Sequence, residues 1–144
     1  MIQKASNVRG LFRGFTLIEL LVVLAILGLL AGLVGPRVLG QLGGAKTKTA
    51  AVQIKDLEQA VDLFKLDVGR YPTQSEGLEA LVVNPSSLGG WNGPYLRRGL
   101  PDDPWGNPYR YQNPGRHGEF DIFTYGADNT PGGSGENADV GNWQ

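Results

Sequence analysis

The chain has 144 residues, and its 13 lysines and arginines nearly balance its 14 aspartates and glutamates, which leaves a net charge of −1. This balance argues against nucleic-acid binding, because nucleic-acid-binding domains gather cations on one surface. The sequence contains no cysteine. The fold therefore cannot be stabilised by the disulfides that many small domains of oxidising compartments contain.

The first predicted element is an apolar helix of membrane-spanning length. From Phe15 to Val34 only Thr16 and Glu19 are polar, and at about 1.5 Å per residue this stretch crosses a ~30 Å hydrocarbon layer. Positive charge ahead of a span keeps that end in the cytoplasm, so we expect the rest of the chain on the other side of the membrane. The leader carries no acid, and its cations are Lys4, Arg9 and Arg13.

Two features bear on whether this stretch is an ordinary signal peptide. Secretory signal peptides are cut at small residues after the apolar region. Residues 31–35 could provide such a site, so a secreted binding domain is one alternative, but Gly14 lies before the apolar region. Glu19 is a carboxylate inside the span, where a charge at the bilayer centre costs ~2.5–3.5 kcal/mol and by default marks a functional site. The alternative is that Glu19 lies near the end of the span and extends its carboxylate to the membrane–water interface.

The sequence Arg-Gly-Phe-Thr-Leu-Ile-Glu-Leu at residues 13–20 resembles the class III signal of prepilins. This resemblance implies that prepilin peptidase cuts between Gly14 and Phe15 on the cytoplasmic side and N-methylates the new Phe15 amine, while the span stays in the mature protein. Gly14 suits the peptidase because a residue without a side chain allows close approach of the backbone. Glu19 would then neutralise the Phe15 amine of a neighbouring subunit in a fibre core and fix the register between subunits.

The helix is predicted to continue beyond the span. Gly35 and Pro36 weaken it, because proline removes a helical hydrogen bond, and we expect a kink or local melting from Gly35 to Gly44 rather than a linker. An apolar stripe at spacings of three and four then predicts an amphipathic helix. Gly69 is a typical C-terminal stop for it. The stripe is Ile54, Leu57, Val61, Phe64 and Val68.

After Gly69 the pattern changes to turns and short strands. Ser75 is a candidate cap for a short helix that ends near Leu81, and Trp105 is interpreted as a core aromatic that pins a turn. Residues 109–112 and 119–125 alternate apolar and polar side chains, which predicts two strands of a hairpin. His117 falls in their connection and is interpreted as solvated, because one loop histidine is poor material for a zinc site or a catalytic triad.

Two further segments resemble the major pseudopilins of type II secretion systems. They are Tyr-Pro-Thr at residues 71–73 with Gly-Leu-Glu-Ala-Leu at residues 77–81, and Asp-Pro-Trp-Gly-Asn-Pro-Tyr at residues 103–109. Residues 126–143 would be taken for a disordered, mildly acidic end from composition alone. They are, however, similar to the C-terminal calcium loop of the same proteins.

The resemblance implies a Ca²⁺ site that orders the tail in place of a disulfide. Asp128 and Asp139 match the acidic ligands, and Ca²⁺ takes six to eight hard oxygen ligands in all. The Tyr125 carbonyl, Ser134 and Glu136 are further candidates. Tyr125 stands where leucine is commoner, so the middle ligands are open, and a metal-free tail is the alternative.

These resemblances identify the chain as a member of the major pseudopilins, the general secretion pathway protein G family. They imply an α+β, type IV pilin-like fold, in which a long N-terminal helix packs on a small antiparallel β-sheet domain. The expected parts are a cleaved leader at residues 1–14, a membrane and assembly helix at 15–35, its periplasmic continuation at 36–69 and a globular domain at 70–144.

The implied function is the major subunit of a periplasmic filament that drives folded proteins across the outer membrane. The implied partners are further copies of the chain, minor pseudopilins, an inner-membrane assembly platform with its ATPase, prepilin peptidase and the lipid bilayer. The expected location is the inner membrane, with one span, a cytoplasmic N-terminus and a periplasmic domain. Alternatives are a type IV pilin or a minor pseudopilin and, less favoured, a membrane-anchored periplasmic enzyme.

Overall fold

The computed structural model describes residues 13–144, so the leader residues Lys4 and Arg9 lie outside the described part of the chain. The chain divides into two compact units, one that ends at Leu39 and one that runs from Gly40 to Gln144. Helix α1 (Leu17–Val68) has 52 residues and extends through the boundary between them.

Helix α1 begins and ends with recognisable caps. At its start the Glu19 N–H donates to Thr16 Oγ1 (3.2 Å), and the Thr16 N–H donates to Glu19 Oε2 (3.0 Å). This reciprocal pair is a capping box. At its end Gly69 adopts φ 88° and donates its N–H to Lys65 O (2.8 Å), which confirms the predicted stop. Pro36 is accommodated inside the helix.

The described part of the N-terminal unit consists of residues 13–16 and the apolar part of α1. Within the described residues, the most apolar 18-residue window of α1 buries no side chain, and the helix is long and apolar enough to cross a membrane. Its large aliphatic side chains, from Leu17 to Val38, are exposed. Such a surface requires an apolar surrounding, either lipid or other helices.

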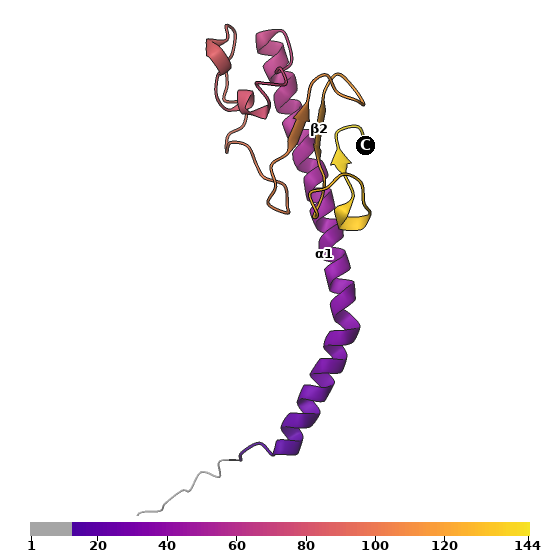
Figure 1. Cartoon of the computed structure of the whole chain (residues 1–144). Helices are drawn as coiled ribbons and strands as arrows, with labels where there is room; N and C mark the ends of the chain where they lie inside the picture. The colour runs from indigo at the N-terminus through magenta and orange to yellow at the C-terminus, as the bar shows by residue number, and fades with distance from the viewer. Residues whose placement is uncertain (1–12) are drawn as a thin grey trace, which may run out of the picture. The chain divides into compact units, whose positions relative to one another are not determined.

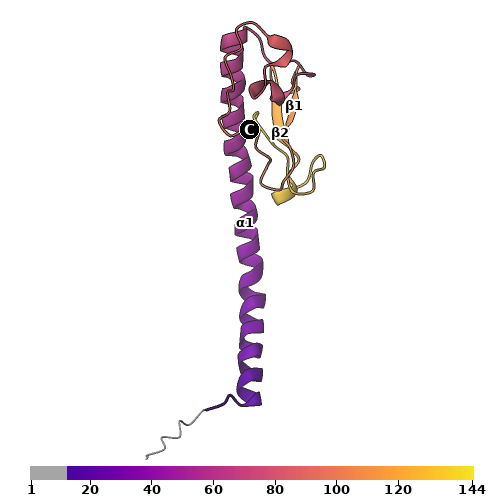
Figure 2. The ribbon, with the colours of Figure 1, turned by 90° about the vertical axis from the view of Figure 1, so that its left-hand side faces the viewer.

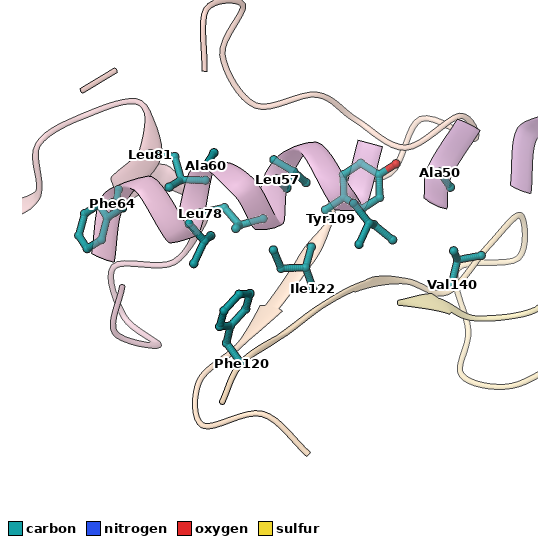
Figure 3. Packing of buried hydrophobic residues seen from close by; sticks show 13 residues of the cluster. Ala50, Leu57, Ala60, Phe64, Leu78, Leu81, Tyr109, Phe120, Ile122 and Val140 are labelled. Atoms are coloured by element: carbon teal, nitrogen blue, oxygen red, sulfur yellow. The ribbon is translucent and has the colours of Figure 1, made fainter. Parts of the chain in front are cut away.

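The core of the second unit is built on one face of α1. Ile54, Leu57, Val61 and Phe64 are at most 1% exposed, which confirms the predicted stripe, whereas Val68 is only partly buried. In Figures 1 and 2 the strands lie beside the C-terminal half of α1. Figure 3 shows Phe120 and Ile122 reaching toward that helix. The other core residues are Ala50, Ala60, Leu78, Ala80, Leu81, Tyr109 and Val140.

The sheet has three short antiparallel strands in the order β1-β2-β3. Strand β1 (Arg110–Gln112) pairs with strand β2 (Asp121–Thr124), and Tyr111 lies opposite Ile122 in this pair. The predicted hairpin is therefore confirmed, with strands shorter than expected. Strand β3 (Val140–Gly141) pairs with β2 and was not predicted, because two residues in a glycine-rich tail give no periodicity.

Among residues 13–144, three 3₁₀ helices connect these elements: η1 (Leu78–Leu81), η2 (Pro85–Ser87) and η3 (Gly135–Asn137). The expectation that Ser75 caps the first of them is wrong. Gly77 precedes η1 without a side-chain cap. The turn before it is closed by Thr73 and Glu76 instead, where each backbone N–H donates to the side chain of the other (2.8 and 3.3 Å).

Asp103 organises the turn that contains Trp105. Its side chain is 4% exposed, and Oδ1 accepts the N–H groups of Trp105 (3.0 Å) and Asn107 (2.8 Å). The Thr124 hydroxyl of β2 donates to its other oxygen. Trp105 packs against the core as a partly buried side chain, which confirms its structural role. The Asp-Pro-Trp-Gly turn is therefore tied to the sheet through one buried carboxylate.

Arg70 forms a two-pronged ion pair with Glu76 (2.7 and 2.8 Å). This pair, helped by the Thr73 N–H, lowers the pKa of Glu76 from 4.5 to about 2. Because the folded pKa is depressed, the stabilisation is complete above pH 4.5 and is lost as the pH falls toward 2. Arg70 is 42% exposed, so we expect Glu76→Gln to lower the free energy of unfolding at pH 7 by only about 1 kcal/mol.

Denaturant unfolding of the full-length protein in detergent micelles, at several pH values between 7 and 2, measures this effect. The exposed Glu79 provides a matched control as Glu79→Gln. The difference between Glu76→Gln and the unchanged protein should shrink steadily below pH 4.5. A difference that stays constant down to pH 2 would contradict the depressed pKa.

Candidate functional site

The segment before α1 presents the predicted processing site in an open setting. Residues 13–16 precede the helix and are exposed. A Cβ built on Gly14 would have no atom within 4 Å, and Phe15 is 91% exposed. The Gly14–Phe15 peptide bond is therefore exposed, as a site for an enzyme must be.

Glu19 has a local role that sequence reasoning missed. Its Oε2 accepts the Thr16 N–H in the capping box, while Oε1 makes no hydrogen bond within residues 13–144. The signal was present in the sequence, because threonine followed three residues later by glutamate marks a helix start. The cap holds the Glu19 carboxylate at the N-terminal end of α1, four residues after Phe15, and leaves one carboxylate oxygen available.

The tail folds into a closed loop. The Ala127 N–H donates to Glu136 O (2.8 Å), and both carboxylate oxygens of Asp139 lie within hydrogen-bond distance of the Gly132 N–H (3.0 and 3.1 Å). Gly126 makes the turn possible. It has φ 77°, and a Cβ there would lie 2.5 Å from Glu136 O. The loop therefore closes through its own backbone and through the side chain of Asp139.

The candidate calcium ligands lie on this loop but do not all converge. Among residues 13–144 no three acidic or histidine side chains form a group that could hold a metal. Asp128 Oδ1 accepts the Thr130 N–H (3.2 Å), and the side chain of Glu136 lies against Gly43 of α1. Ser134 precedes η3 and makes no side-chain cap. The Tyr125 ring packs under the Arg110 guanidinium, 4.6 Å away.

Asp128 and Asp139 nevertheless share one chemical property. In the described part of the chain neither carboxylate forms an ion pair. Two unpaired carboxylates and the carbonyl oxygens of a tight loop are the hard oxygen donors that Ca²⁺ takes. These donors are therefore of the chemical type that calcium takes, and any ion bound here would need backbone oxygens for most of its ligands.

His117 is exposed, as interpreted, with 46% of its side chain accessible, but two contacts hold it in place. Its Nδ1 lies 3.0 Å from Asp121 Oδ2, and its ring stacks on Trp143 with centroids 4.0 Å apart and planes 17° from parallel. Burial raises the pKa of the Asp121 carboxyl, but hydrogen bonds from the Arg116 N–H and from His117 outweigh burial and bring this pKa below its ordinary value. Trp143 reaches His117 because β3 returns the tail to the sheet. No local sequence pattern predicts this contact between distant residues.

Comparisons with known proteins place the chain in a family. The family model "Type II secretion system (T2SS), protein G" matches residues 37–143, and the model of the prokaryotic N-terminal methylation motif matches residues 10–35. The core protein G of the type II secretion system of Vibrio cholerae is 50% identical over 133 residues and 90% of each chain. That of Pseudomonas aeruginosa is 48% identical over 90% of this chain and 94% of its own.

A solved structure gives the same result for the fold. The crystal structure of the major pseudopilin of enterohaemorrhagic Escherichia coli matches with a TM-score of 0.63 and 37% identity, over 72% of this chain and 87% of that one. The family model and these relatives are all protein G, which supports the major pseudopilin among the alternatives, and this family is structural rather than enzymatic. The chain therefore belongs to the protein G family of type II secretion systems, the major pseudopilins.

Proposed function

We propose that the mature subunit begins at Phe15 and waits in the inner membrane, with its N-terminus in the cytoplasm and residues 40–144 in the periplasm. The observation that carries this proposal is the exposed apolar half of α1, which follows directly on an open Gly14–Phe15 bond. Lipid covers that surface before assembly, and the equivalent helices of other subunits cover it afterwards.

An ATPase-driven platform in the inner membrane would extract each subunit and add it to a helical filament that includes minor pseudopilins. Contacts between unlike surfaces of identical subunits build a filament rather than a ring when the rotation between subunits does not close. The growing filament then pushes folded proteins through a pore in the outer membrane. In this scheme the chain does no chemistry and is itself the substrate of prepilin peptidase.

Glu19 would set the register of this filament. Its free Oε1 accepts the charged Phe15 amine of a neighbouring subunit, while its Oε2 keeps the capping box with Thr16. A subunit out of register would leave that amine buried without a partner, which costs about 3–5 kcal/mol. The pairing therefore selects one stagger between subunits.

Variants of Glu19 test the filament and the register together. We expect Glu19→Ala to insert in the membrane normally, but to give almost no cross-linked subunit ladder and little export of a folded substrate in cells. Glu19→Gln is the sharper variant, because its amide oxygen can keep the capping box but carries no charge. Normal ladders from Glu19→Gln would refute the charge pairing. Long sheared surface fibres at native expression would favour a pilin function instead.

We further propose that residues 125–139 bind Ca²⁺ through Asp128, Asp139 and backbone oxygens, including the carbonyl of Tyr125. Two unpaired carboxylates on one closed loop support this proposal, and Ser134 is a secondary candidate. Glu136 is not included as a side-chain ligand, because its carboxylate lies against Gly43. The bound ion would neutralise the loop and fasten the tail to the sheet.

Removal of calcium should therefore lower the stability of the domain. At about 100 times the dissociation constant, a single bound ion adds about 2.7 kcal/mol to the free energy of unfolding. Unfolding of the full-length protein in micelles, with Ca²⁺ or with a chelator, measures this difference. We expect Asp128→Asn and Asp139→Asn to abolish it and the exposed Asp56→Asn to leave it intact. Equal stability of the unchanged protein with and without Ca²⁺ would sink the proposal.

A further inference from the structure

Gly43 is the first residue of the second unit whose surface is covered. It is buried, whereas its neighbours Leu42 and Gly44 are exposed. The cover is the side chain of Glu136, because a Cβ built on Gly43 would lie 2.4 Å from its Cγ and 2.5 Å from its Cδ. The same construction on Gly40 and Gly44 meets no atom within 4 Å.

The position of Glu136 is set by the closed tail loop. Its carbonyl accepts the Ala127 N–H at 2.8 Å, and the Asn137 N–H donates to Ser134 O at 3.1 Å to form the turn of η3. Gly133 has φ 99°, and a Cβ there would lie 2.5 Å from Asn137 O, so the backbone on both sides of Glu136 is tightly packed. The side chain therefore reaches Gly43 only while the loop is closed.

The helix beneath this contact is intrinsically weak. Gly40, Gly43 and Gly44 fall within five residues, and glycine is the least favourable residue in a helix interior after proline. The Thr47 hydroxyl also donates to Gly43 O at 3.2 Å, a bond of the kind that competes with the helical pattern. A segment of this composition opens locally unless something packs on it.

We propose that Glu136 is a latch that couples closure of the tail loop to the helicity of residues 40–47. The side chain from Cγ to the carboxylate covers the Gly43 backbone and shields it from water, which stabilises the helix in that segment. Coupling of this kind is reciprocal: an open loop leaves the glycine segment free to unwind, and an unwound segment removes the surface on which Glu136 rests. A ligand that orders the loop thereby also orders the helix at residues 40–47.

Amide hydrogen exchange of the full-length protein in detergent micelles, followed by mass spectrometry, tests the coupling in both directions. In Gly43→Ala the new methyl group displaces Glu136, so exchange in residues 126–138 should rise about fivefold, as expected for a local opening. Gly44→Ala is the matched control, because it makes the same change in the same helix without contact. It should leave exchange in the loop unchanged.

The reverse direction uses Glu136. Glu136→Ala should raise exchange in residues 40–47 about fivefold and leave residues 54–64 of the core unchanged. Glu136→Gln keeps the covering atoms without the charge and should behave as the unchanged protein. The latch proposal would be overturned if residues 40–47 of Glu136→Ala exchanged as slowly as in the unchanged protein. It would also be overturned if the loop of Gly43→Ala did so. These outcomes are differences between variants in one buffer and need no filament assembly, so they are separate from tests of the proposed function.

Discussion

Gly14→Val should abolish processing, so that the full-length chain accumulates in the membrane with residues 1–14 still attached. The reason is steric, because a peptidase that binds the Gly14 backbone closely has no room for a branched side chain. The substitution should not disturb the chain itself, since a Cβ on Gly14 meets no atom of the described residues within 4 Å. Any loss of cleavage then reports on recognition by the enzyme.

Intact mass and N-terminal sequencing of protein purified from its native membrane measure this result. The unchanged chain should begin at methylated Phe15, and Gly14→Ala should be processed at an intermediate rate because a methyl group is smaller. Gly28→Val makes the same change inside the span, also in open space, and should be processed normally. A mature chain that begins after Ala31 or Gly35 would show a signal peptide instead, and complete processing of Gly14→Val would exclude Gly14 as the determinant.

The parts that could be predicted from sequence are those with local signals. The apolar run from Phe15 to Val34 and the stripe from Ile54 to Phe64 repeat over many residues, so their period identifies a helix and its buried face. Gly69 is predictable as the helix end because glycine adopts positive φ without a steric cost. The β1–β2 hairpin was found from alternation, although its strand ends were not.

The features that could not be predicted depend on contacts between distant parts of the chain. Thr124 donates to Asp103, and Trp143 stacks on His117. In each pair, no sequence pattern around one residue predicts its contact with the other. The tail is the strongest case, because its glycines resemble disorder in composition but allow the positive φ angles and close backbone contacts that build the loop.

The candidate calcium ligands also depend on a contact between distant parts of the chain. Resemblance placed Asp128, Glu136 and Asp139 in one loop, and the carboxylates of Asp128 and Asp139 turn toward backbone N–H groups of that loop. Glu136 turns instead toward α1, because Gly43 leaves a gap of the right size there. The lack of a side chain at Gly43 therefore sets the direction of the Glu136 side chain, more than ninety residues later in the sequence. No local sequence rule predicts such a dependence.

Phe64→Ala should cause the largest loss of stability among single substitutions in the core. Phe64 is fully buried, and its ring packs edge-on against Tyr95 with centroids 5.9 Å apart. Truncation of a buried phenylalanine costs about 3–5 kcal/mol through lost burial and the cavity that is left. Because small domains are stable by only about 5–15 kcal/mol, this loss removes a large part of the total. Alanine favours helix more than phenylalanine, so the loss cannot be assigned to α1 itself.

Tryptophan fluorescence during thermal or denaturant unfolding in micelles reports on this domain selectively, because Trp91, Trp105 and Trp143 all lie outside the apolar half of α1. At about 4 °C per kcal/mol for a domain of this size, the midpoint of Phe64→Ala should fall by roughly 12–20 °C. Leu66→Ala is the matched control, two residues away on the same helix with 79% of its side chain exposed. It should change the free energy of unfolding by no more than about 0.5 kcal/mol. Equal losses from the two variants would mean that the face of α1 that carries Phe64 is not the one that holds the domain together.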